Sequence, residues 1–207
     1  IKMSASNKER KVPVLVDKPM DFCPGCGHGI ISRLIMECLD ELEQSDNIIF
    51  PIGVGCSSNL GAGLECDRLH CSHGRAGAVA TGMKRVNPDV LIVSYQGDGD
   101  AYNIGIAETF NAAYRNENIT VIVVNNTNFG MTGGQMSLTT PSKINQLKGY
   151  IKNGLQAQMN HEGYSVIEVL SPCPVNWGLT PVKAMERIES ELVPYYPLGE
   201  FKKREVR

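Results

Sequence analysis

The sequence has no apolar run long enough to cross a membrane, no low-complexity tract and no excess of either charge. Twenty basic and 22 acidic side chains nearly cancel among 207 residues, which argues against a broad surface for nucleic acid or anionic lipid. A membrane span needs about 18 consecutive apolar residues, and no signal peptide is visible. We therefore expect a cytoplasmic protein that binds neither nucleic acid nor membrane.

The sequence also lacks a paired set of cysteines, because their number is 7. A chain of this length buries roughly 70% of the surface that its unfolded form exposes, so it needs no disulfides to stabilise a core. An odd number of cysteines in such a chain indicates metal binding, redox chemistry or plain burial. The length favours one domain.

Continuous apolar strands alternate with helices along most of the chain. Such strands are typical of a parallel sheet that helices cover on both faces, so we expect a doubly wound, mostly parallel α/β fold. Residues 1–20 are expected to form an N-terminal arm and residues 21–207 a single domain, in which 65–71 is irregular. The expected strands are 48–54, 90–95, 119–124 and 165–170, and the expected helices are 30–42, 74–86, 104–114, 143–160 and 181–192.

Two of the expected strands end in polar motifs, Gly97-Asp98-Gly99 and Asn125-Asn126. Ligands of doubly wound sheets bind beyond the carboxyl ends of the strands. Glycines let the backbone approach an anion closely. Oxygens of Asp98, Asn126 and the Asn128 backbone, together with diphosphate and water, would suit octahedral Mg²⁺. This pattern resembles the thiamine diphosphate motif and predicts a thiamine diphosphate-binding fold of the diphosphate type, in which Gly97, Gly99 and Thr132 surround the diphosphate.

The pair Cys23-x-x-Cys26 is by itself compatible with zinc, a redox pair or an iron–sulfur site. More specific information comes from six motifs that follow one another in a fixed order. They are Cys23-Pro-Gly-Cys26-Gly, Gly53-Val-Gly-Cys56-Ser57, His73-Gly-Arg75, Gly97-Asp-Gly-Asp100, Thr132-Gly-Gly-Gln135 and Ser171-Pro-Cys173-Pro. Together they resemble the beta subunit of 2-oxoacid:ferredoxin oxidoreductases over about residues 20–190.

This resemblance implies further cofactors and residue roles. A 4Fe–4S cluster would be held by Cys23, Cys26, Cys56 and Cys173, and thiolates on separate loops suit such a cluster. His73 and Ser57 would border the thiamine diphosphate pocket. The remaining cysteines are Cys38, expected in the core, and Cys66 and Cys71, interpreted as free thiols rather than as a second metal site with His70. His28 is interpreted as a turn residue.

The resemblance also implies the reaction. The chain would be part of an enzyme that oxidatively decarboxylates a 2-oxoacid to acyl-CoA and CO₂, with electrons passed through the cluster to ferredoxin. Bound thiamine diphosphate would accept the electron pair as CO₂ leaves, and no residue of this chain is assigned as an acid–base catalyst. Two alternatives stay open: a subunit of a non-oxidative thiamine diphosphate-dependent decarboxylase, and a catalytically silent assembly subunit. The motifs do not distinguish between 2-oxoacids.

Two features concern what lies outside the chain. The resemblance implies that a separate alpha subunit binds the pyrimidine side of the cofactor. We therefore expect an obligate complex, with a gamma subunit as a further candidate partner. After Thr139-Thr-Pro141 the resembled proteins usually carry another β-α unit. We therefore hypothesise that a segment near residues 142–144 is missing from the sequence, and an intact mass of 22.6 kDa would contradict this.

Overall fold

A computed structural model describes residues 12–137, 147–194, 196 and 199, so the hypothesis about residues 142–144 lies outside the described residues. Five parallel strands form one sheet in the order β2-β1-β3-β4-β7. They are β1 (Ile48–Ile52), β2 (Asp67–His70), β3 (Leu91–Gly97), β4 (Thr120–Asn125) and β7 (Ser165–Leu170). The short strands β5 (Asn128–Phe129) and β6 (Gln135–Met136) form an antiparallel pair.

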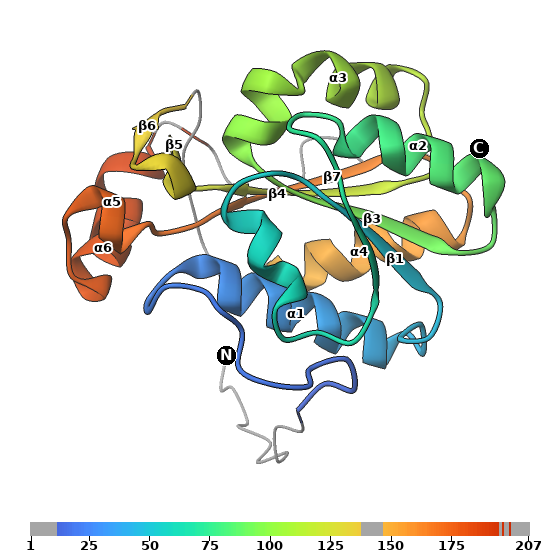
Figure 1. Cartoon of the computed structure of the whole chain (residues 1–207), viewed down its shortest axis with the longest axis horizontal. Coiled ribbons are helices and arrows are strands. Elements are labelled where there is room, and N and C mark those ends of the chain that lie inside the picture. The colour runs from blue at the N-terminus through green and yellow to red at the C-terminus, as the bar shows by residue number, and fades with distance from the viewer. Residues whose placement is uncertain (1–11, 138–146, 195, 197–198, 200–207) are drawn as a thin grey trace.

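Helices cover both faces of the sheet, which confirms the predicted doubly wound α/β fold (Figure 1). The helices α1 (Gly27–Glu41) and α4 (Leu147–Met159) cover one face, and α2 (Ala76–Val86) and α3 (Ile106–Tyr114) cover the other. The short helices α5 (Pro174–Trp177) and α6 (Pro181–Arg187) lie with β5 and β6 at one end of the sheet. None of the helices in the described part of the chain has the length and hydropathy needed to span a membrane.

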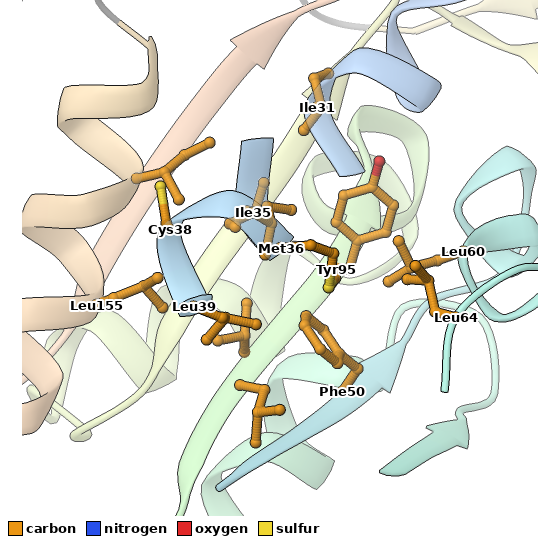
Figure 2. Close-up of a cluster of buried hydrophobic side chains, with 14 of the residues drawn as sticks. Ile31, Ile35, Met36, Cys38, Leu39, Phe50, Leu60, Leu64, Tyr95 and Leu155 are labelled. Atoms are coloured by element: carbon orange, nitrogen blue, oxygen red, sulfur yellow. The ribbon is translucent and has the colours of Figure 1, made fainter. Parts of the chain in front are cut away.

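Alternation along the central strands divides the core into two layers. Leu91 and Val93 of β3 pack toward α1, whereas Ile92 between them packs toward α2 and α3, because successive strand side chains point to opposite faces. Figure 2 shows the larger layer, in which Tyr95 and Phe50 lie among the apolar side chains of α1. The smaller layer is rich in alanine, which allows α2 and α3 to approach the sheet closely.

Four short helical turns connect these elements: η1 (Cys56–Gly61), η2 (Gly99–Ile104), η3 (Gly130–Thr132) and η4 (Ile188–Leu192). Two of them correct the predicted helices. The helix expected over 104–114 is preceded by the π-helical turn η2, and the one expected over 181–192 ends at Arg187 before the π-helical turn η4. In both places a wider turn interrupts the apolar periodicity from which a single helix was predicted.

The prediction that 65–71 is irregular was wrong, because β2 lies there and pairs with β1. All four residues of β2 are exposed, so the apolar run that indicated the other strands is absent.

The described part of the expected N-terminal arm packs against the domain. Val16 forms an isolated antiparallel bridge with Leu64, and Leu15 is 6% exposed within the larger core layer. The proposed boundary at residue 20 is not tested by these contacts and stays a prediction.

Candidate functional site

The two polar motifs meet at the carboxyl ends of β3 and β4. Gly97, the last residue of β3, pairs in register with Val124 of β4, so the residues that follow each strand are neighbours. The side chains of Asp98, Asn126 and Asn128 are all buried there. The sheet register therefore brings together the three residues that the sequence predicted as magnesium ligands.

The side-chain amide of Asn126 lies between two oxygen atoms, the backbone oxygen of Asn128 and Asp98 Oδ1. In one orientation of the Asn126 side-chain amide, its oxygen lies 2.7 Å from the backbone oxygen of Asn128 and 3.2 Å from Asp98 Oδ1. In the other orientation the amide nitrogen donates to both oxygens. A group of converging oxygens is what Mg²⁺ requires, so the arrangement fits the ion, and rotation of one amide satisfies the same atoms without it.

The two glycines beside these oxygens have different surroundings. A Cβ atom at Gly99 would lie 2.4 Å from the ring of Phe129, which covers this turn. A Cβ atom at Gly97 would meet nothing within 4 Å, so the backbone there borders open space. That combination is compatible with an anionic group lying against the turn.

Three other residues were predicted for the cofactor pocket, and each has different contacts. The Ser57 side chain is fully buried, and its hydroxyl donates to the backbone oxygen of Gly53 at 3.3 Å. Thr132 is exposed in η3, where its hydroxyl lies 2.6 Å from Gln135 Oε1. His73 lies before α2, and its Nδ1 is 2.5 Å from Asp100 Oδ1. Only His73 thus contacts the motif that follows β3.

The four cysteines predicted as cluster ligands come from three separate parts of the chain. Cys23 and Cys26 lie in the turn that enters α1, Cys56 begins η1, and Cys173 precedes α5. Close packing brings the first and the last of these parts together: a Cβ atom at Gly25 would lie 2.7 Å from Pro181, and one at Gly27 would lie 2.4 Å from Ser171 Oγ.

The thiols are close enough to affect one another's ionisation. Burial, followed by the charges of Cys173, Cys56 and Cys23, raises the pKa of Cys26 to about 11. Burial and then Cys173 and Cys23 raise the pKa of Cys56 to about 11. Among the described residues, no three His, Cys, Asp or Glu side chains already have the geometry of a metal site. The donor set is chemically suited to an iron–sulfur cluster, and loading would have to draw the sulfurs together.

Asn176 of α5 links this thiol cluster to the oxygen group, and the sequence gave no reason to select it. Its Nδ2 lies 2.8 Å from the backbone oxygen of Gly130, 3.4 Å from Cys173 Sγ and 3.4 Å from Asn128 Oδ1. Cys173 and the loop that carries Asn128 are therefore linked through one side chain. Only the position three residues after Cys173 could have drawn attention to this asparagine.

The three remaining cysteines lie apart from this site or take no part in it. Cys38 is fully buried in the core layer of Figure 2, as predicted. Cys71 is a buried free thiol whose pKa is raised to about 11 by burial and by Asp100. Cys66 is a free thiol in the wall of a cavity of about 580 Å³ between the N-terminal segment and the starts of β1 and β2.

His28 differs from its prediction as a turn residue. It lies in the first turn of α1 and is buried, with Nδ1 2.7 Å from the Tyr95 hydroxyl. Burial lowers its pKa to about 3, so the ring is neutral and structural at ordinary pH. The apolar spacing began two residues later and gave no sign of this contact.

Comparison with known proteins identifies the class to which this site belongs. Residues 53–166 match the family model of the C-terminal TPP-binding domain of thiamine pyrophosphate enzymes. The matched span contains both polar motifs, so the chain carries a thiamine pyrophosphate-binding domain. A 4-hydroxybenzoylformate decarboxylase from Rhodococcus jostii shares this fold at 18% identity, with a TM-score of 0.51 over 68% of this chain and 32% of that one.

Similar proteins of known name narrow the class further. A 2-oxoglutarate synthase subunit KorB from Methanocaldococcus jannaschii is 35% identical over 77% of this chain and 72% of its own length. The 2-oxoglutarate:ferredoxin oxidoreductase from Magnetococcus marinus, solved with 2-oxoglutarate, coenzyme A and succinyl-CoA, has a TM-score of 0.69 at 28% identity, over 82% of this chain and 70% of that one. The chain therefore belongs to the family of 2-oxoacid:ferredoxin oxidoreductase beta subunits, which confirms the resemblance found in the sequence.

The relatives also differ from the chain in length. A ketoisovalerate oxidoreductase subunit VorA from Methanothermobacter thermautotrophicus is 34% identical over 88% of this chain but only 48% of its own length. The chain thus spans about half the length of this relative. The aligned span of 227 positions exceeds the 207 residues of the chain, so the relative has positions within the alignment that have no counterpart here.

Proposed function

We propose that the chain is the thiamine diphosphate and iron–sulfur subunit of an enzyme that oxidatively decarboxylates a 2-oxoacid to acyl-CoA and CO₂ and passes the electrons to ferredoxin. The observation that carries this proposal is the connection between Cys173, one of the four proposed cluster ligands, and the loop that bears the converging oxygens. Asn176 contacts both Cys173 and the Asn128–Gly130 loop, so an electron carrier at the thiols would lie beside a cofactor at the oxygens.

In this proposal the oxygens of Asp98, Asn126 and the Asn128 backbone hold Mg²⁺. Gly97, Gly99 and Thr132 surround the diphosphate, and His73 and Ser57 border the pocket. Bound thiamine diphosphate supplies an acceptor for the electron pair released on decarboxylation. The residues of this chain bind and orient it, and the burial of Asp98 and Asn126 keeps bulk water away from the ion.

The proposed cluster ligands are Cys23, Cys26, Cys56 and Cys173. Donor groups near the sulfurs and burial tune the potential of such a cluster. Asn176 supplies one such donor at 3.4 Å from Cys173 Sγ, and Cys173 itself is 7% exposed. The cluster would therefore be largely shielded on the side of α5, whereas Cys23 is exposed and faces the side from which an electron acceptor can approach.

The proposed complex includes an alpha subunit that carries the pyrimidine side of the site, with a gamma subunit, ferredoxin, a 2-oxoacid and coenzyme A as further partners. The exposure of Met131 and Thr132 in the described chain supports a partner that covers this edge, and the resemblance suggests the others. We place the complex in the cytoplasm, as the sequence suggested, with no part in nucleic-acid or membrane binding.

The test uses the complex co-expressed without oxygen with its partner chains. We expect a brown protein whose visible absorbance is bleached by dithionite and which reduces ferredoxin only when a 2-oxoacid and coenzyme A are both present. A colourless complex that releases CO₂ without reducing ferredoxin would instead support the non-oxidative decarboxylase. A complex that assembles without retaining thiamine diphosphate would support the silent assembly subunit.

A matched pair of variants assigns the cluster. We expect Cys173→Ser to remove or distort the electron paramagnetic resonance signal of the reduced cluster. Cys66→Ser, at a cavity wall away from the site, should leave that signal unchanged. Loss of the signal in both variants, or in neither, would contradict the assignment.

A further inference from the structure

Asp100 is a buried carboxylate that three separate segments of the chain supply with hydrogen-bond donors. Its Oδ1 accepts from the backbone N–H of Gly74 at 2.8 Å and of Val54 at 3.2 Å. Its Oδ2 accepts from Gln96 Nε2 at 2.6 Å, and the side chain has no exposed surface. Both oxygens are acceptors in these contacts, which is the role of an ionised carboxylate.

The fold is built to admit this carboxylate. A Cβ atom at Gly53 would lie 2.2 Å from Asp100 Oδ2, so only glycine fits where the chain leaves β1. Gly74 has a φ of +78°, a region that glycine adopts without strain, and in that conformation its N–H is directed at Asp100. Two glycines in separate motifs thus border one side chain.

The same carboxylate determines which nitrogen of His73 carries a proton. His73 Nδ1 lies 2.5 Å from Asp100 Oδ1. Because a carboxylate has no proton to donate, the hydrogen of this contact belongs to Nδ1. In a neutral imidazole the other nitrogen, Nε2, is then an acceptor. Among the described residues no hydrogen bond to Nε2 is formed, and the side chain is 33% exposed.

The ring of His73 lies at the same edge of the sheet as the proposed magnesium site. It makes an edge contact with Phe129, at 6.3 Å between ring centroids. Phe129 in turn covers Gly99 of the proposed diphosphate turn. An acceptor nitrogen with no partner in the described chain therefore stands beside the place where the ligands of this site would bind.

We propose that Asp100 is a positioning residue, which holds His73 in the Nδ1–H tautomer so that Nε2 accepts a hydrogen bond or a proton from a donor group of the bound ligand. This inference deepens the proposed function and rests on it for the nature of the ligand. The tautomer itself depends only on the contacts within this chain. The assignment of the tautomer and the proposed function can therefore be contradicted independently of each other.

The tautomer is tested by nuclear magnetic resonance on the chain labelled with ¹⁵N-histidine. The chain has only 4 histidines, and the spectrum of His73→Gln identifies the signals of His73. We expect the proton of the neutral ring on Nδ1. Asp100→Asn should shift the ratio of the tautomers at least about tenfold toward Nε2–H, whereas the exposed control Asp89→Asn should not change it.

An Nε2–H ring in the wild-type spectrum would overturn the proposal, and so would an unchanged tautomer ratio in a folded Asp100→Asn variant. Where Asp100→Asn does not fold, the wild-type spectrum alone decides. Neither measurement requires a cofactor or a partner chain. A complex that lacks oxidoreductase activity would therefore contradict the proposed function and leave this result in place.

The catalytic consequence is tested in the complex. We expect Asp100→Asn and His73→Gln each to lower kcat at least about 100-fold, the lower range for a lost proton acceptor, with thiamine diphosphate still bound. Because Asp100 acts through His73, the double variant should lose no more than His73→Gln alone. Losses that multiply would show that Asp100 acts independently and would overturn its positioning role.

Discussion

At the scale of single residues, the site depends on the orientation of one side-chain amide, that of Asn126. The side-chain amide of Asn126 either turns its oxygen toward Asp98 and the Asn128 carbonyl or donates to both of them. An amide can serve the loaded and the metal-free site in this way because its two ends differ only in donor and acceptor character. A carboxylate at position 126 would place two negative groups together and lack the second option.

The first prediction concerns Asp98, the charged member of the oxygen group. Asp98→Asn keeps the volume of the side chain but removes the charge, so we expect the affinity for Mg²⁺ to fall at least about tenfold. Titration calorimetry of the complex with Mg²⁺ at saturating thiamine diphosphate measures this. Asp89→Asn, on the exposed loop before β3, is the matched control, and equal affinities in the two variants would contradict the assignment of Asp98.

The second prediction concerns the buried thiol of Cys71. Its raised pKa of about 11 keeps it protonated at neutral pH, and only about one thiol in a thousand is ionised at pH 8. We expect iodoacetamide to modify exposed Cys23 of the cluster-free protein first at pH 8. Alkylation of Cys71 should accelerate about tenfold per pH unit up to about pH 10. Peptide mass spectrometry follows each cysteine, and rapid reaction of Cys71 at pH 8 would show that its thiol is not shielded.

Single residues also mark the limit of what the sequence predicted. Asp98, Asn126 and Asn128 could be selected because each follows a recognisable apolar strand, and the sheet register brings them together. Asp100 lies in the same motif, but its partners His73, Val54 and Gly74 follow other strands. They could be identified only from the folded structure, in which the ends of three strands lie side by side. Asn176 contacts a loop 46 residues away, a distance over which local spacing gives no information.

At the scale of elements, strands with a fully buried apolar run could be located from the sequence, whereas exposed ones could not. β3 and β4 are buried along nearly their whole length. β2, with four exposed residues at the edge of the described sheet, has polar residues where the others are apolar. The pairing of its backbone with β1 stabilises it, and backbone pairing leaves no mark on the side-chain pattern.

The third prediction concerns the junction between η2 and α3. A Cβ atom at Gly105 would lie 2.4 Å from the backbone oxygen of Gly74 and 2.6 Å from that of Asp100. Backbone atoms cannot rotate away, so we expect Gly105→Ala to lower the free energy of unfolding by about 1–3 kcal/mol. It should also move the segment that bears Asp100. Urea unfolding measures the first effect.

Gly82 provides the matched control because it lies inside α2 with nothing within 4 Å of a Cβ atom. There the intrinsic preference of helices for alanine should dominate, so Gly82→Ala is expected to raise the free energy of unfolding by about 1 kcal/mol. Equal effects of the two substitutions would mean that the approach of η2 to Gly74 is looser than these contacts require.

At the scale of the whole molecule, the described part of the chain has two well-packed layers and an edge with several exposed residues. The core layers account for the sheet and its four long helices. By contrast, the loop over the carboxyl ends exposes Met131, Thr132 and Gly133, and His73 is one-third exposed beside it. The sequence predicted a partner subunit at this edge through a resemblance alone, because a wall that another chain supplies leaves no pattern in this one.

The fourth prediction follows from that open edge. If a partner subunit supplies the opposite wall, the isolated chain holds thiamine diphosphate only through its phosphate end and Mg²⁺, and contacts to the rest of the cofactor are missing. We expect the isolated chain to lose thiamine diphosphate during gel filtration in Mg²⁺ and the complex with the alpha subunit to retain about one equivalent per copy of this chain. The complex that carries Asp98→Asn separates the two contributions, because it should assemble normally but lose the cofactor. Stoichiometric retention by the isolated chain would contradict the prediction, since it would mean that residues of this chain alone close the site.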